Sequence, residues 1–287
     1  MKTYLVKYRT SLQESGKSIY TVQAYLKDIE QLIEFTKATK LKDITEDSIK
    51  KYTASLKKAN YDLKSISRKI NSIKSFFKHM IENGHVKKDP SENIHHPKIT
   101  EKIPRYLTKE EYNKLKTMCA TDYRTHAMVE LLLQSGIRIG ELCRLKLSNI
   151  TYKSKNRPYA ITIEKHQSTP PRIVPLNNAA VEALKQYFEI RPETQKTAYM
   201  FVTKSGKPIV IRNARTYISR AMKKSKIKNA TVNDLRNTFI FHNIKNGANL
   251  MTLSQIVGHK NLSSTIKFTK IQKQRKNSKN QIILKDL

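Results

Sequence analysis

Residues 231–270 constrain the fold strongly, because apolar residues recur there at helical spacing around a few isolated polar ones. A first amphipathic run holds Arg236 just inside its start, and a second run ends at Gly258-His259. Ser263 then begins a third run, which presents Phe268. This stretch therefore predicts packed helices that hold an arginine and a histidine near the end of the chain.

The chain is strongly basic. Its 287 residues include 56 lysines and arginines against 23 aspartates and glutamates, which gives a formal net charge of +33. A positive field of this size attracts polyanions, so nucleic acid is the default partner. A ribosomal protein or a basic toxin is the alternative, but the length of the chain and its helical periodicity argue against both.

Several classes of protein are disfavoured by what the sequence lacks. Residues 1–10 contain no apolar signal core, and no apolar run approaches bilayer-spanning length. We therefore expect a soluble, cytoplasmic, nucleoid-associated protein with no membrane partner. We expect no metal and no cofactor, because no cluster of His, Cys and Asp has ligand spacing and no glycine-rich nucleotide loop is present. Cys119 and Cys143 are expected to be buried free thiols.

The first 84 residues are predicted to be helical throughout. Runs with apolar residues on one face and basic residues on the other begin at Ser18, Thr45 and Ser65. Residues 85–105 have the composition of a linker, because three prolines interrupt the periodicity. The basic faces indicate either a plain helical bundle with a solvated surface or a clamp on the DNA backbone, and we prefer the clamp.

The second part of the chain alternates between helical and extended patterns. An apolar run at 125–133 predicts a buried helix, and Arg138 opens the helix that follows. Residues 159–163 and 172–176 alternate as two strands of a hairpin whose turn contains Lys165. A short strand is expected at 199–202.

These motifs resemble those of the tyrosine recombinases, the phage-integrase and Xer family. That family has Thr-Gly-Leu-Arg-x-x-Glu-Leu, then His-x-Leu-Arg-His-Thr-Phe, Asn-Gly-Ala, Leu-Gly-His and Ser-Thr-Thr before a nucleophilic tyrosine. The matching segments are residues 134–142, 233–239, 246–248, 257–259 and 263–265. The likeness extends more weakly to the N-terminal helices and so covers nearly the whole chain.

The resemblance implies a phosphoryl transfer that needs no metal. A tyrosine oxygen would attack phosphorus and hold the 3′ phosphate. Arg138 and Arg236 would clamp the non-bridging oxygens, and His259 would donate a hydrogen bond to the same group. Lys165, at the position of the family's hairpin lysine, is the candidate general acid for the leaving 5′ oxygen.

Two functional positions depart from the family. Asn233 stands where the family has a histidine; its amide can donate a hydrogen bond but cannot exchange a proton near neutral pH. Phe268 stands at the nucleophile position, and its ring has no oxygen. Either the chain is a natural protein that binds without cutting, or a tyrosine was deliberately changed to phenylalanine. The intact Arg138, Arg236 and His259 favour the second interpretation.

The implied fold class is mainly α with a small β-sheet, arranged as a two-domain C-shaped DNA clamp. We expect a SAM-like helical core-binding domain at 1–84, a linker at 85–105, a catalytic domain at 106–271 and a tail at 272–287. Apolar residues 282–284 of the tail would dock either on a neighbouring subunit or on their own molecule. Candidate DNA contacts are the basic residues Arg68, Lys69, Lys74, Lys78, Arg212, Arg215 and Arg220.

The implied partners are double-stranded DNA with inverted-repeat core sites, a homo-tetramer assembled on that DNA, and accessory DNA-bending proteins. The reaction would be site-specific recombination that integrates, excises or resolves a mobile element or replicon, with cleavage lost through Phe268. A non-catalytic DNA-binding protein with the same fold and a basic RNA-binding protein are the alternatives.

Overall fold

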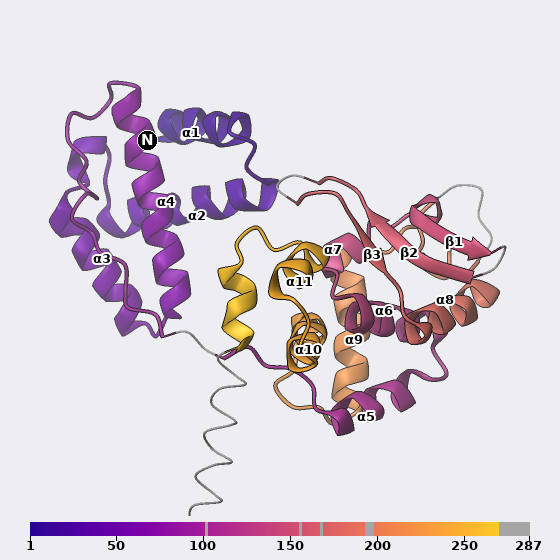
Figure 1. Cartoon of the computed structure of the whole chain (residues 1–287). Coiled ribbons are helices and arrows are strands. Elements are labelled where there is room, and N and C mark those ends of the chain that lie inside the picture. Colours follow the sequence, from indigo (N-terminus) through magenta and orange to yellow (C-terminus); the bar gives the residue numbers. More distant parts are fainter. Residues whose placement is uncertain (101–102, 155–156, 167–168, 193–197, 270–287) are drawn as a thin grey trace, which may run out of the picture. The chain divides into compact units, whose positions relative to one another are not determined.

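The structure is a computed structural model that describes residues 1–100, 103–154, 157–166, 169–192 and 198–269. The chain divides into two compact units, Met1–Glu101 and Lys102–Leu287 (Figure 1). Helices dominate both units and one small sheet lies in the second, so the predicted class of mainly α with a small β-sheet is confirmed. The predicted tail at 272–287 lies outside the described residues.

The first unit is helical, as its periodicity predicted. Its elements are α1 (Lys2–Glu14), α2 (Ile19–Thr36), a 3-10 turn (Leu41–Asp43), α3 (Glu46–Lys58) and α4 (Leu63–Glu82). Ser18 caps α2 by accepting a 3.1 Å hydrogen bond from the backbone nitrogen of Thr21. The apolar face of α4, which includes the fully buried Phe76 and Phe77, packs against α2 and α3. Helix α1 closes the core against α2 and α4.

A buried polar cluster joins α2 to α4. Asp28, 1% exposed, accepts hydrogen bonds from Lys69 Nζ at 3.0 Å and Ser72 Oγ at 2.8 Å, and it also pairs with Arg68 Nη1. Lys69 Nζ donates in addition to Gln31. A buried carboxylate needs partners of this kind. Arg68 and Lys69, at the start of α4, therefore stabilise the fold by pairing with Asp28.

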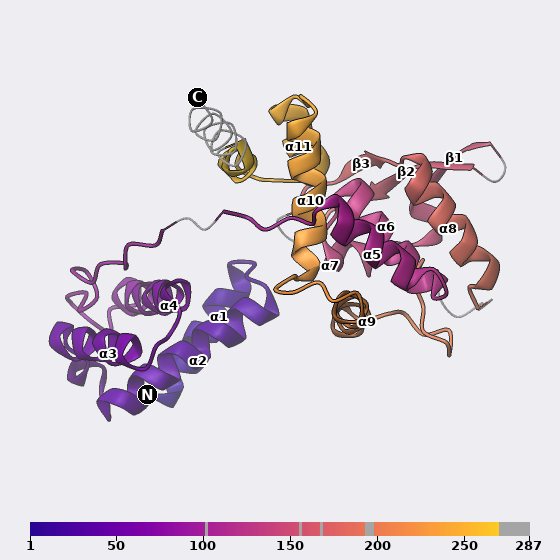
Figure 2. The ribbon, with the colours of Figure 1, turned by 90° about the horizontal axis from the view of Figure 1, so that it is seen from below.

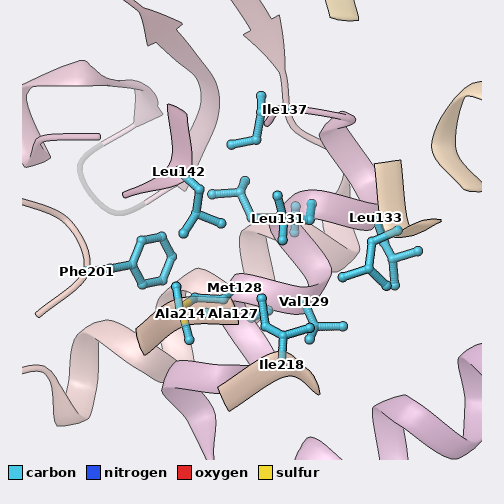
Figure 3. Close-up of a cluster of buried hydrophobic side chains, with 14 of the residues drawn as sticks. Ala127, Met128, Val129, Leu131, Leu133, Ile137, Leu142, Phe201, Ala214 and Ile218 are labelled. Atoms are coloured by element: carbon cyan, nitrogen blue, oxygen red, sulfur yellow. The ribbon is translucent and has the colours of Figure 1, made fainter. Parts of the chain in front are cut away.

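The second unit is built around α6 (Tyr123–Ser135), which contacts helices on several sides. Its apolar side chains lie among Leu142, Phe201 and Ile218 from neighbouring segments (Figure 3). The other helices are α5 (Lys109–Cys119), α7 (Ile139–Leu142), α8 (Asn178–Ile190), α9 (Ile211–Lys224), α10 (Val232–Lys245) and α11 (Leu250–Val257). Cys119 and Cys143 are buried free thiols, as expected.

Among the described residues, antiparallel strands form one sheet in the order β1 (Ile150–Ser154), β2 (Arg157–Ile163), β3 (Arg172–Pro175). Ile161 of β2 pairs with Val174 of β3, so the predicted hairpin is confirmed. The strand predicted at 199–202 is wrong: Tyr199 and Val202 make isolated bridges to Lys146 and Pro208. Lys146 and Pro208 lie in irregular segments, so each bridge stays isolated and does not extend into a strand.

The C-terminal part of the described chain forms a smaller apolar cluster. Helices α10 and α11 pack side by side, in agreement with both views (Figures 1 and 2). A short helix at 263–269 follows, and the cluster unites Phe241, Leu253, Val257 and Phe268. Within the described ranges, no helix has the length and apolar content to span a bilayer.

Candidate active site

Arg236 lies inside α10, whose start is fixed by hydrogen bonds between Thr231 and Asp234. Thr231 N and Oγ1 donate to Asp234 Oδ2 at 2.7 and 2.9 Å. Arg236 is 5% exposed, and its Nη1 donates to the carbonyl of Gly136. Its Nη2 is buried and finds no acceptor among the residues that the structure describes. Because an unpaired buried donor is unfavourable, Nη2 marks a place where an outside acceptor would bind.

Arg138 is held on a different element, at the start of α7. Its backbone nitrogen donates to Glu141 Oε2 at 2.7 Å, and its Nη1 donates to Glu141 Oε1 at 3.1 Å. Its Nη2 donates to the carbonyl of Gly258 at 2.7 Å. The side chain keeps 40% of its surface exposed, so the guanidinium is oriented and still accessible.

Two glycines allow these elements to approach. Gly136 (φ +64°) ends α6, and a Cβ there would overlap the ring of Phe239 on α10. Gly258 (φ +67°) ends α11, and a Cβ there would lie 2.8 Å from the guanidinium of Arg172. Both backbones adopt the left-handed region that favours glycine. The two carbonyls that receive Arg236 and Arg138 therefore belong to residues that only glycine suits.

Glu141 and Arg172 form a buried pair beneath the site. Arg172 Nη1 and Nη2 donate to the two Glu141 oxygens at 3.0 and 2.8 Å, and its Nε donates to the carbonyl of Ile256 at 2.6 Å. Burial alone would raise the pKa of Glu141, but hydrogen bonds from Arg172 and Arg138 and their charges outweigh it and hold that pKa below its usual range. Glu141 therefore remains a carboxylate that links two arginines.

His259 follows Gly258 and faces the helix at 263–269. Its Nδ1 lies 2.8 Å from Oγ1 of Thr265, a residue with 0% exposure. Burial, followed by the charges of Arg236, Arg138 and Arg172, lowers the pKa of His259 to about 4. The imidazole is therefore neutral at pH 7 and acts as a hydrogen-bonding group without charge.

The positive charges of Arg236 and Arg138 act on each other. Burial and then the charge of Arg138 lower the pKa of Arg236 to about 9, while Glu141 opposes the shift. Arg236 still carries its charge at neutral pH. An anion bound between these guanidinium groups would relieve their mutual repulsion.

Lys165 and Asn233 are the two remaining residues of the predicted site. Lys165 follows β2, is exposed, and lines a cavity of about 70 Å³ together with Glu141 and Arg144. The hairpin end thus lies beside the residue that orients Arg138. Asn233 is exposed on the first turn of α10, and its amide nitrogen lies 3.4 Å from Asn237 Oδ1.

Phe268 does not lie as we expected. The sequence predicted that the third helical run presents this ring to the site, but Phe268 is 4% exposed and packs with Phe241, Leu253 and Val257. Burial of an aromatic ring without a polar atom is favourable, which explains the difference. The cluster still adjoins the site through Val257, whose carbonyl lies 3.5 Å from Arg138 Nη1.

The candidate DNA contacts divide into two groups. Lys69 was predicted to be a surface contact, but its side chain is 4% exposed and paired with Asp28. Arg68 shares that carboxylate with 43% of its side chain exposed. The remaining candidates are exposed or partly exposed on α4 and α9: Lys74, Lys78, Arg212, Arg215 and Arg220.

Sequence reasoning missed two residues of the site. Arg172 was treated only as part of a strand, and Thr265 only as part of a helix start. The available signal for Arg172 was a basic residue at the beginning of an alternating strand. Across the described ranges, no group of His, Cys, Asp and Glu gathers in a way that could hold a metal ion.

Charged guanidinium groups on two helices, a neutral imidazole beside them and a lysine on the adjacent hairpin define a site that suits a phosphate group. Residues 105–275 match the Phage integrase family, and residues 5–84 match its N-terminal SAM-like domain. The chain belongs to the phage integrase family. It is 30% identical over 289 residues to the tyrosine recombinase XerD of Staphylococcus saprophyticus subsp. saprophyticus, covering 95% of each protein.

Solved structures share the fold. A lambda integrase tetramer bound to a Holliday junction superposes with a TM-score of 0.77 at 20% identity, covering 93% of this chain and 76% of that one. The Tn1549 transposon integrase in complex with transposon right end DNA gives 0.73 at 19% identity, covering 92% and 94%. That integrase carries a tyrosine-to-phenylalanine substitution.

Proposed function

We propose that Arg138, Arg236 and His259 bind one backbone phosphate of duplex DNA, and that the chain is a site-specific recombinase of the phosphotyrosine type in a cleavage-deficient form. The observation that carries the proposal is Arg236 Nη2, a buried donor that no described residue binds. A non-bridging phosphate oxygen supplies an acceptor of the right charge. The half-exposed guanidinium of Arg138 supplies the second arm of the clamp.

The proposed chemistry needs an oxygen at position 268. A tyrosine oxygen there attacks phosphorus and gives up its proton to water or another group, the bond from phosphorus to the 5′ oxygen breaks, and a 3′-phosphotyrosine forms. Lys165 gives its proton to the departing 5′ oxygen. Arg138, Arg236 and His259 stabilise the negative charge that develops on the non-bridging oxygens. Asn233 adds a donor at the edge of the site.

With Phe268 the reaction stops after DNA binding, because the phenyl ring has no nucleophilic oxygen. Because Arg138, Arg236 and His259 are intact, they support the interpretation that a tyrosine at position 268 was replaced by phenylalanine. A second candidate, a DNA-binding protein that never cuts, is favoured by the burial of Phe268 in an apolar cluster. The two candidates make different predictions for the variant Phe268→Tyr.

The proposal extends to the whole chain. Residues 1–84 form the core-binding domain, 85–105 the linker and 106–271 the catalytic domain, and both domains contact the same duplex. The net charge of +33 supports binding to DNA and association with the nucleoid. The tetrameric state of the lambda integrase neighbour supports a homo-tetramer on paired inverted-repeat sites. Accessory DNA-bending proteins would impose direction, and the tail at 272–287 would dock on a subunit.

The test begins by selecting duplex DNA from a random library with the protein as it stands. Phe268→Tyr is then incubated with the selected, strand-labelled duplex, and denaturing gels are scored for a covalent adduct at a 3′ phosphate. The recombinase proposal expects an adduct with Phe268→Tyr and none with the starting protein or with Phe268→Tyr combined with Arg236→Gln. Tight binding by Phe268→Tyr without any adduct would establish the non-cutting candidate instead.

A further inference from the structure

The hydrogen bond between His259 and Thr265 carries information about the protonation of the imidazole. Thr265 is fully buried in the helix at 263–269, and its Oγ1 lies 2.8 Å from His259 Nδ1. The backbone of His259 is fixed as well, since its nitrogen donates to the carbonyl of Ser254 at 3.0 Å. Ring and hydroxyl are therefore held in one relative position.

Two arrangements of protons fit this distance, and they differ in what they leave unpaired. If the Thr265 hydroxyl donates, Nδ1 is the acceptor and the ring proton sits on Nε2. If Nδ1 carries the proton, it donates to Oγ1, and the hydroxyl proton needs another acceptor. Within the described part of the chain, His259 is the one side chain or carbonyl to which the Thr265 hydroxyl is bonded. The first arrangement therefore satisfies the buried hydroxyl, and the second does not.

The surrounding charges exclude the third state, an imidazolium with a proton on each nitrogen. Arg138, Arg172 and Arg236 each disfavour a positive charge on the ring, and burial acts in the same direction. Glu141, the acidic group of this cluster, is already bonded to Arg138 and Arg172. The choice thus lies between the two neutral tautomers.

We propose that Thr265 is a positioning residue that holds His259 in the tautomer with its proton on Nε2. Resting on the proposed function, this makes His259 a donor to the phosphate and removes it as an acceptor for the proton of a tyrosine at position 268. That proton must leave through another group or water. Thr265 and position 268 lie three residues apart on one helix, so a single element sets the tautomer and places the nucleophile.

The tautomer can be measured without DNA and without activity. Long-range proton–nitrogen spectra of protein labelled with ¹⁵N-histidine separate the two neutral forms, and His259→Gln assigns the signal. We expect the Nε2-protonated pattern in the starting protein and in Thr265→Ser, which keeps the hydroxyl. Thr265→Val, of nearly the same shape, should lose the single pattern and show a mixture. An Nδ1-protonated ring in the starting protein, or an unchanged pattern in Thr265→Val, would overturn the proposal.

If Thr265→Val is unstable, Thr265→Ala, which also lacks the hydroxyl, takes its place in the same spectra. A second readout uses the Phe268→Tyr background and the selected duplex. Thr265→Val should form adduct more slowly by about tenfold to a hundredfold, and Thr265→Ser should restore the rate. If Phe268→Tyr forms no adduct but the spectra are as expected, the tautomer assignment stands and the proposed function fails.

Discussion

Arg138 Nη2 donates a 2.7 Å hydrogen bond to the carbonyl of Gly258, 120 residues later in the chain. This bond joins the start of α7 to the turn that carries His259. Arg236 makes the corresponding connection from α10 to Gly136, two residues before Arg138. Each arginine therefore fixes a glycine turn that lies next to the other functional residues. Both guanidinium groups keep donors available for an anion.

Arg236→Lys should abolish the proposed phosphate clamp and leave the fold intact. An ammonium keeps the charge but cannot bond Gly136 and a phosphate oxygen with two fixed nitrogens. In the Phe268→Tyr background we expect adduct formation to slow by about a hundredfold or more. Rates on the selected duplex measure the effect, with Arg9→Lys at an exposed position of α1 as the control. Equal rates for the two variants would show that Arg236 does not touch the reacting phosphate.

Gly258→Ala should destabilise the second unit more than Gly247→Ala. Both glycines have positive φ, which costs an alanine about 1 kcal/mol. A Cβ at 258 would also lie 2.8 Å from the Arg172 guanidinium, whereas no atom lies within 4 Å of one at 247. We expect the difference between the variants to be at least about 1 kcal/mol, measured by urea denaturation. Equal losses would mean that Arg172 moves away without cost.

Arg172→Met should destabilise the second unit by about 3–5 kcal/mol, because it leaves the buried Glu141 carboxylate with fewer partners. The folded-state pKa of Glu141 is depressed, so this carboxylate contributes stability above its ordinary pKa and loses it as pH falls through the folded value. Removing Arg172 raises that pKa, so acid unfolding should begin at higher pH. Adding Glu141→Gln should recover part of the lost stability, and no recovery would argue against a paired charge.

The stability contributed by His259 should also fall as the pH drops, because its folded-state pKa is lowered as well. Its folded-state pKa of about 4 lies below the ordinary value of 6.5. Below pH 6.5 the unfolded chain takes up a proton more readily than the folded one, so stability falls as pH drops from about 6.5 towards 4. We expect His259→Gln to flatten this part of the curve of unfolding free energy against pH. A curve unchanged by the substitution would place His259 in a more solvated position.

The basic residues of α4 and α9 should differ in function, with Lys69 stabilising the fold and Arg215 binding DNA. Lys69→Met should lower the stability of the first unit by about 3 kcal/mol, because it breaks the buried pair with Asp28. Arg215→Met should instead weaken DNA binding and reduce its dependence on salt by about one counterion. Urea denaturation tests Lys69→Met, and binding isotherms at several salt concentrations, with structured RNA as competitor, test Arg215→Met. Preference for RNA would contradict the recombinase proposal.

The sequence was sufficient to predict the helices and the hairpin, because apolar spacing reflects packing within one element. It also predicted Arg138, Arg236 and His259 as a group, since their motifs resemble a family. It could not reveal that Arg172 reaches Glu141, because that pair joins two elements across the interior. For the same reason Lys69 was expected at the surface: its partner Asp28 lies on another helix.

Phe268 shows the same limit in another way. Its position relative to His259 identified it with the nucleophile of the family, but whether the ring faces the arginines or the apolar cluster depends on how the helix at 263–269 packs. Loss of the hydroxyl removes the polar atom that would oppose burial. The local sequence pattern was sufficient to predict a helix. The rotation of that helix against α10 and α11 depends on tertiary packing, which the pattern does not encode.

A structure of the starting protein on its selected duplex tests the central claim most directly. We expect one backbone phosphate to lie within hydrogen-bonding distance of Arg236 Nη2, the Arg138 guanidinium and His259 Nε2 together. A phosphate bound by only one of these groups, with Arg236 Nη2 still buried away from DNA, would contradict the proposed site.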